Sequence, residues 1–286
     1  MKEPINFLKR RELGDILNDT FKFIRNEFKP LFGLIFKTAG LALLIMVVAY
    51  VFYARSVGDI ADFRTNSDLA LLGMALSGLI MLIAAVAFYS LLYGTILHYI
   101  KSYIKHNGVV VKEEVAEGIK RNFWSLIGLS ILVGLMSGVG FVFCIAPGVY
   151  LATVLATTYA IHIFEKRSVS DSISYSFDLI KGEWWITFAT LLVMFIIYYI
   201  VIIIVQVPQY VYLFAKDFTM AEQLSGDPSM MIDWGYIILT ALGLIVQYLM
   251  QILIVITTVF VYFNLNEKKN FTGTMETIES IGNREE

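Results

Sequence analysis

The sequence predicts an all-α polytopic membrane protein: a bundle of six transmembrane helices with three amphipathic helices at the membrane surface. The first observation behind this prediction is composition. Of the 286 residues, 58% are hydrophobic and only 16% are charged, whereas a soluble domain carries about 25% charged residues. The second observation is a set of long apolar blocks. The third is the uneven distribution of lysine and arginine among the segments that separate those blocks.

Six apolar blocks can cross a bilayer, because a helix needs about 20 residues to span a hydrocarbon core of about 30 Å. Only Ala146-Pro147-Gly148 separates the third block from the fourth. Proline lacks an N–H and glycine allows a reversal, so we expect a hairpin that turns at Pro147 and Gly148. A single kinked helix is the alternative, but it would overshoot the bilayer. The blocks cover about 33–54, 70–97, 124–145, 149–165, 185–207 and 235–264.

The positive charges lie on one side if the chain crosses six times from an internal N-terminus. The outer loops then hold only Arg55, Arg64 and Lys216. Such an excess of inner cations agrees with the positive-inside rule, and it predicts a multi-pass membrane protein with both termini in the cytoplasm. The inner cations are Lys2, Lys9, Arg10, Arg11, Lys22, Arg25, Lys29, Lys101, Lys105, Lys112, Lys120, Arg121, Lys166, Arg167, Lys181, Lys268, Lys269 and Arg284.

The four tryptophans agree with this topology, because tryptophan concentrates at the two interfaces of a membrane. Trp124, Trp184 and Trp185 fall at the expected inner interface, and Trp234 falls at the outer one. We therefore interpret all four as interfacial anchors.

An amphipathic stretch precedes the first, third and fifth blocks. Alignment of the three stretches at isoleucines 24, 119 and 180 also aligns Arg25, Lys120 and Lys181. Either an internal duplication or the convergence of amphipathic sequences explains the match. A duplication predicts parallel hairpins around a pseudo-threefold axis, with repeat units of about 12–107, 108–166 and 167–267. Residues 1–267 then form one membrane domain, and residues 268–286 form a short polar tail.

The first amphipathic stretch places apolar residues at steps of three and four, which is typical of a helix with one apolar face. Such a helix lies in the headgroup plane and directs its cations toward anionic lipid. The helices are either simple interfacial collars or a specific surface for lipids or partners. The candidate headgroup ligands are Arg25, Lys29, Lys120, Arg121 and Lys181.

The expected spans contain few polar groups. Gln247 and Gln251 lie one helical turn apart, and two amides in hydrocarbon either bond to a neighbouring helix or contact a solute. With Thr153 and Thr157 they are the candidate lining of a central cavity. We interpret His98 and His162 as interfacial anchors. The single cysteine and the lack of a histidine-rich motif predict no metal and no cofactor.

The chain resembles a family of bacterial integral membrane proteins: the membrane domain found in front of some glycerophosphodiester phosphodiesterases, and its uncharacterised stand-alone relatives. The resemblance implies a location in a bacterial cytoplasmic (inner) membrane and this multi-pass architecture. It does not imply the phosphodiesterase reaction, because the catalytic barrel is absent. It rests on Leu13-Gly14-Asp15-Ile16-Leu17 with Thr20-Phe21, on Cys144-Ile145-Ala146-Pro147-Gly148-Val149-Tyr150-Leu151, and on Ser176-Phe177-Asp178-Leu179-Ile180-Lys181-Gly182-Glu183-Trp184-Trp185.

These patterns predict a non-enzymatic membrane protein with a structural or lipid-environment role. Its expected partners are membrane lipids, whose anionic headgroups bind the cytoplasmic face. The net charge of −2 gives no indication of nucleic-acid binding, and the pattern specifies no protein partner. The alternative is a transporter or channel for an apolar or amphiphilic solute through the central cavity. A lipid enzyme would need close approach among His98, His162, Glu165 and Asp178.

Overall fold

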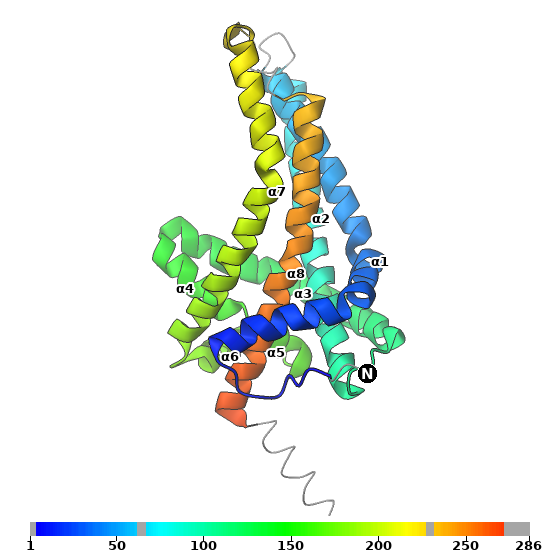
Figure 1. Ribbon diagram of the computed structural model, residues 1–286, viewed down its shortest axis with the longest axis vertical. Coiled ribbons are helices and arrows are strands. Elements are labelled where there is room, and N and C mark those ends of the chain that lie inside the picture. The colour runs from blue at the N-terminus through cyan, green and yellow to red at the C-terminus, as the bar shows by residue number, and fades with distance from the viewer. Residues whose placement is uncertain (1–3, 62–66, 227–231, 272–286) are drawn as a thin grey trace, which may run out of the picture. The chain divides into compact units, whose positions relative to one another are not determined.

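The computed structural model describes residues 4–61, 67–226 and 232–271, and the statements below concern these residues. Within them the regular structure is entirely helical (Figure 1), which confirms the predicted all-α class. Lys2, Arg64, Arg284 and most of the predicted tail lie outside the described residues. The helices are α1 (Leu13–Ala61), α2 (Ser67–Lys105), α3 (Lys112–Phe143), α4 (Ile145–Leu155), α5 (Thr158–Phe164), α6 (Val169–Ile180), α7 (Trp184–Gly226) and α8 (Trp234–Asn270).

Six helical segments in the described part of the chain are long and apolar enough to span a membrane, as the sequence predicts. Large apolar side chains on several of them are exposed, including Leu41, Leu69 and Ile204 at 70%, 67% and 64%. In a helix that crosses a bilayer, such side chains contact lipid rather than water. The protein is therefore a multi-pass membrane protein. The segments are Leu13–Gly58, Asp68–Lys105, Lys112–Phe143, Ile145–Phe164, Trp184–Thr219 and Trp234–Asn270.

Only one of the three amphipathic stretches forms a separate helix. The first is continuous with its span in α1, and the second is continuous with its span in α3. The third is α6, which ends where Lys181 becomes extended and Gly182 adopts a φ of +84°. Glycine tolerates this left-handed conformation without a steric penalty. A separate helix therefore forms only at the third stretch, whereas α1 continues through Pro30 and α3 continues into its span.

The hairpin between the third and fourth spans is confirmed, but its turn lies earlier than expected. The helix breaks at Cys144, whose φ and ψ of −172° and 158° are extended. Pro147 and Gly148 instead lie in the first turn of α4, where a missing N–H removes no helical hydrogen bond. A Cβ on Gly148 would lie 2.4 Å from the ring of Phe141. Gly148 thus permits close packing of the two helices rather than their reversal.

The chain forms two compact units, each built from segments distant in sequence. Unit 1 comprises residues 1–38, 89–196 and 252–286, and unit 2 comprises residues 39–88 and 197–251. Every described cation that the sequence assigns to the inner side belongs to unit 1, whereas Arg55 and Lys216 belong to unit 2. The threefold hairpin repeat, with units of about 12–107, 108–166 and 167–267, stays a prediction.

The core of unit 1 forms where the first part of α1 crosses the last part of α8 (Figure 1). Phe7 stacks on Phe260 with ring centroids 4.6 Å apart. The same ring meets Phe23 edge-on at 5.4 Å, and all three side chains are at most 1% exposed. Each buried aromatic ring removes a large apolar area from solvent. Phe7 therefore anchors residues 4–12, which we call the N-terminal strap, in the packed core.

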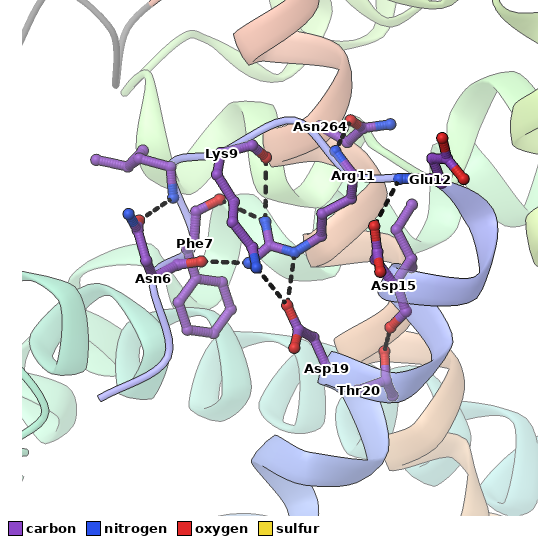
Figure 2. Close-up of polar contacts among 11 residues, drawn as sticks. Asn6, Phe7, Lys9, Arg11, Glu12, Asp15, Asp19, Thr20 and Asn264 are labelled. Atoms are coloured by element: carbon purple, nitrogen blue, oxygen red, sulfur yellow. Dashed lines mark hydrogen bonds and ion pairs between the residues drawn. The ribbon is translucent and has the colours of Figure 1, made fainter. Parts of the chain in front are cut away.

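Arg11 fastens this strap to α1 (Figure 2). Its guanidinium donates to Asp19 at 2.8 Å and to the carbonyls of Phe7 and Lys9 at 2.9 and 3.2 Å, and it also contacts the carbonyl of Asn6. Its backbone N–H donates to Asn264 Oδ1 on α8 at 2.8 Å. Burial lowers the pKa of Arg11, and the bond to Asp19 opposes that shift. The guanidinium donors are thus committed to structural contacts.

Unit 2 contains an ion pair between α7 and the residue preceding α8. Lys216 Nζ lies 2.7 Å from Asp233 Oδ2, and the Tyr212 hydroxyl donates to the same carboxylate at 2.6 Å. Partial burial raises the pKa of Asp233, but the hydrogen bonds from Lys216 and Tyr212 outweigh this effect and lower it to about 2. This cluster joins α7 to the start of α8.

Candidate functional site

The cations predicted to bind headgroups lie on the surface of unit 1. Arg25, Lys29, Lys120, Arg121 and Lys181 are all exposed. Arg25 also lines a shallow hollow with Lys22, Phe21 and Ile24, so this part of α1 presents charge and apolar surface together. Such a combination suits the boundary between headgroups and acyl chains. Among the predicted anchors, Trp124 and Trp185 are 79% and 75% exposed, Trp234 is 53% exposed, and Trp184 is partly buried.

One of these cations, Arg121, belongs to a pocket that concentrates positive charge. The pocket has a volume of about 350 Å³, which is the lower end of the range for small-molecule sites. Its lining comes from the last turns of α2, the first half of α3, α5 and the α5–α6 loop, all in unit 1. We call it the basic pocket, and its lining residues are His98, Lys101, Arg121, Asn122, His162, Ile163, Lys166 and Arg167.

His162 is held in a fixed orientation. Its Nδ1 lies 2.7 Å from the carbonyl of Arg167, and its Nε2 lies 2.8 Å from Ser125 Oγ. Because a carbonyl oxygen only accepts, Nδ1 carries the hydrogen. The preceding residue, Lys166, has a φ of +56°, which is uncommon for a non-glycine residue and strained. This turn lies in the short α5–α6 loop, immediately before the carbonyl that His162 uses.

His98 is buried without a hydrogen-bond partner on Nε2 among the described residues. The residue is only 5% exposed. Its ring packs against α3 at Gly118, where a Cβ would lie 2.3 Å from Nδ1. A buried polar atom without a partner is costly. His98 lines the pocket, and its Nε2 is a buried polar atom whose hydrogen-bonding capacity the described residues leave unused.

The pocket cations differ in how their charge is balanced. Arg167 Nε donates to Glu165 at 2.6 Å, and this bond raises the pKa of Arg167. Lys101 Nζ donates to the carbonyl of Ile163 at 2.6 Å. This bond satisfies one donor but does not neutralise the positive charge of Lys101. Within the described chain, Lys101, Arg121 and Lys166 make no ion pair with a carboxylate. The pocket thus has an excess of positive charge and can hold an anion.

The sequence predicted only part of this site. Arg121 was expected to face headgroups. His98 and His162 were interpreted as anchors, or as part of a cluster that only a lipid enzyme would need, and the other three cations of the pocket were interpreted as topology markers. One signal was available: each histidine stands one helical turn before a lysine, at 98 and 101 and at 162 and 166. Packing between α2, α3 and α5 then brings the two pairs together, which spacing alone does not reveal.

The residues predicted to line a central cavity fall into different units. Gln247 and Gln251 belong to unit 2, and Gln251 Nε2 donates to the Tyr198 hydroxyl at 3.4 Å. Thr153 and Thr157 belong to unit 1 and donate to carbonyls of their own helix segment, those of Val149 and Val154. None of the four lines the basic pocket. In the described residues, no group of three or more His, Cys, Asp or Glu side chains could hold a metal ion.

Two motifs that carry the family resemblance meet in unit 1. Tyr150 of α4 lies 5.8 Å from Trp184 and 6.5 Å from Phe177, measured between ring centroids. Comparison with known proteins gives no match to a family model, to a curated protein or to a solved structure. The fold therefore defines a multi-pass membrane protein, and its basic pocket is the site from which a function can be argued.

Proposed function

We propose that this protein is a non-enzymatic inner-membrane protein that binds anionic lipid at its cytoplasmic face and so organises the local lipid environment. The observation that carries the proposal is the basic pocket, where Lys101, Arg121 and Lys166 bring unbalanced charge from separate segments into one cavity. Each cation near an anionic membrane surface contributes about 1 kcal/mol of attraction. A cavity adds selectivity, because its donors face one bound group together.

The exposed collar cations support the same proposal. Arg25, Lys120 and Lys181 occupy equivalent positions in the three amphipathic stretches, and all are exposed. They would hold anionic lipid loosely around the protein, while the basic pocket would bind one headgroup. The meeting of Tyr150 with Trp184 is compatible with the proposed membership in the family of bacterial membrane domains described above.

A lipid hydrolase is the second candidate, because Ser125 Oγ and His162 Nε2 are at the distance of a nucleophile and its base. However, Ser125 Oγ also lies 2.8 Å from the carbonyl of Asn122, and Ser125 is not among the lining residues of the pocket. We therefore interpret Ser125 as a positioning residue for His162. Release of fatty acid or headgroup from lipid vesicles by the wild type, lost in Ser125→Ala, would favour the hydrolase instead.

The transport alternative would use Gln247, Gln251, Thr153 and Thr157. Gln251 donates to Tyr198, and Thr153 and Thr157 donate to helix carbonyls, which satisfies groups that a solute would otherwise contact. These bonds favour a structural role for the residues, in contacts between and within helices, over contact with a solute. Uptake of a solute by proteoliposomes would be the evidence for transport.

The experiment that tests the proposed function is lipid retention. The full chain and two triple variants are purified from the same membranes, and the bound phospholipids are counted by mass spectrometry. Lys101→Gln/Arg121→Gln/Lys166→Gln removes the pocket charge, and Arg25→Gln/Lys120→Gln/Lys181→Gln removes the collar charge. We expect both variants to retain less anionic lipid. Equal retention by wild type and both variants would refute the proposal.

The proposed topology has its own test. In a Cys144→Ser background, Ser170→Cys reports on the segment after the basic pocket, and Asp217→Cys reports on the end of α7. Both positions are exposed. A membrane-impermeant maleimide added to intact cells should label position 217 and spare position 170, because the cationic segments face the cytoplasm. The reverse pattern would place the pocket on the external side.

A further inference from the structure

We infer that the basic pocket is selective for a phosphate monoester dianion over a phosphodiester. The inference rests on the proposed function, because it names the anion that the same pocket binds. Charge is the first argument. Arg167 is neutralised by Glu165, which leaves Lys101, Arg121 and Lys166 as three unbalanced cations around one cavity. A phosphate monoester carries a charge of about −1.5 to −2 at neutral pH, so it offsets this excess better than a singly charged diester.

The number of donors is the second argument. A monoester presents three terminal oxygens, whereas a diester presents two. The pocket offers donors from three separate segments: the ammonium of Lys101 on α2, the guanidinium of Arg121 on α3 and the ammonium of Lys166 in the α5–α6 loop. Arg121 and Lys166 are exposed, so a ligand that enters the pocket can reach their donors. Three terminal oxygens can engage the three donors together.

Two kinds of ligand carry a phosphate monoester: phosphatidic acid, in its headgroup, and a soluble phosphate ester. A volume of about 350 Å³ accommodates a headgroup but not the acyl chains, which would have to lie outside the pocket. Apolar surface is available nearby, because Trp124 follows the lining residues of α3 by one turn or less and is 79% exposed. The experiment below has a separate arm for each source.

In the lipid arm, the full chain is placed in phosphatidylcholine nanodiscs that contain either phosphatidic acid or phosphatidylglycerol, and the lipid that remains bound is quantified by native mass spectrometry. We expect phosphatidic acid to be enriched about tenfold over phosphatidylglycerol, since one extra charge-assisted contact is worth about that factor. Arg121→Gln/Lys166→Gln should remove the preference. Lys112→Gln, which deletes an exposed cation at the start of α3 that neither lines the pocket nor belongs to the collar cations, should keep it.

In the soluble arm, inorganic phosphate is titrated calorimetrically into the protein in nanodiscs of phosphatidylcholine alone. Binding that Arg121→Gln/Lys166→Gln abolishes, without enrichment of either lipid, would support the monoester chemistry and refute the lipid role. Equal enrichment of the two lipids, lost in the pocket variants, would overturn the inference and leave the proposed function standing. Lipid enrichment unchanged in the pocket variants would overturn both. Unaltered helical content and recovery of binding by Arg121→Lys would show that a variant's loss is not unfolding.

Discussion

Replacement of Arg11 by alanine should destabilise the protein by about 3 kcal/mol. The Arg11 side chain is fully buried, and it donates to Asp19 and to carbonyls of the N-terminal strap. It also lies 4.8 Å above the ring of Phe260. Removal of one partner of a buried ion pair costs about 3–5 kcal/mol. We take the lower end, because Asp19 keeps Lys9 at 3.4 Å.

The neighbouring residue provides a matched control. Arg10 is exposed and lies over the ring of Phe271 at 4.7 Å, so Arg10→Ala should cost less than about 1 kcal/mol. The assay is reversible unfolding in mixed micelles, monitored by tryptophan fluorescence. Limited proteolysis should also release the strap from the Arg11→Ala variant before it cleaves elsewhere. Equal stability of the Arg10 and Arg11 variants would refute our account of the strap as part of the core.

Two further predictions concern packing and pH. Gly118→Ala should displace His98, because the new Cβ would lie 2.3 Å from His98 Nδ1. Overpacking of this kind costs about 1–3 kcal/mol of stability, and the displacement should also weaken lipid retention. Gly128→Ala, whose Cβ would meet open space, should change neither stability nor lipid retention. The contact of Asp233 with Lys216 should stabilise the fold above about pH 4, the ordinary pKa range of an aspartate, and the stabilisation should fade as pH drops to about 2, the lowered pKa of Asp233. Thermal unfolding between these pH values checks the second prediction, and a wild-type profile identical to that of Asp233→Asn would contradict it.

Apolar length and charge asymmetry were sufficient to predict the spans, because hydrocarbon thickness imposes a minimum length on each one. The ends of the elements were harder to predict. Pro147 and Gly148 resemble a turn in sequence, yet proline is equally suited to the first turn of a helix. The break falls at Cys144, a residue with no turn signature. Local sequence alone does not distinguish these two uses of proline.

The alignment that pairs Arg25 with Lys181 also pairs Asp15 with Asp171, and the two aspartates share a structural role. Asp15 Oδ2 accepts from the backbone N–H of Glu12 at 3.2 Å, and Asp171 Oδ2 accepts from Ser168 Oγ at 2.7 Å. In each case the aspartate reaches back three residues to the start of its helix, as a capping residue does. The middle helix, α3, has Val111 at this end and no side-chain cap. A physical role in capping therefore explains these aspartates whether or not the stretches are duplicated.

The basic pocket could not be predicted from sequence, because its charge is spread over positions 98 to 167. The positive-inside rule explains lysine and arginine at every inner helix end, so it does not distinguish a cation that lines a cavity from one that faces the membrane surface. Arg121 and Lys120 are adjacent and both exposed, yet only Arg121 lines the pocket. Their difference depends on which face of α3 packs against α2 and α5.

Photo-crosslinking tests the central claim most directly. A phosphatidic acid analogue with a photoreactive group beside the phosphate is added to the full chain in nanodiscs, and the adducts are mapped by peptide mass spectrometry. The account predicts that adducts concentrate on the peptides that contain His98, Arg121 and Lys166, and that excess unlabelled phosphatidic acid suppresses them. Adducts spread evenly over the exposed collar cations, with none on the pocket peptides, would contradict it.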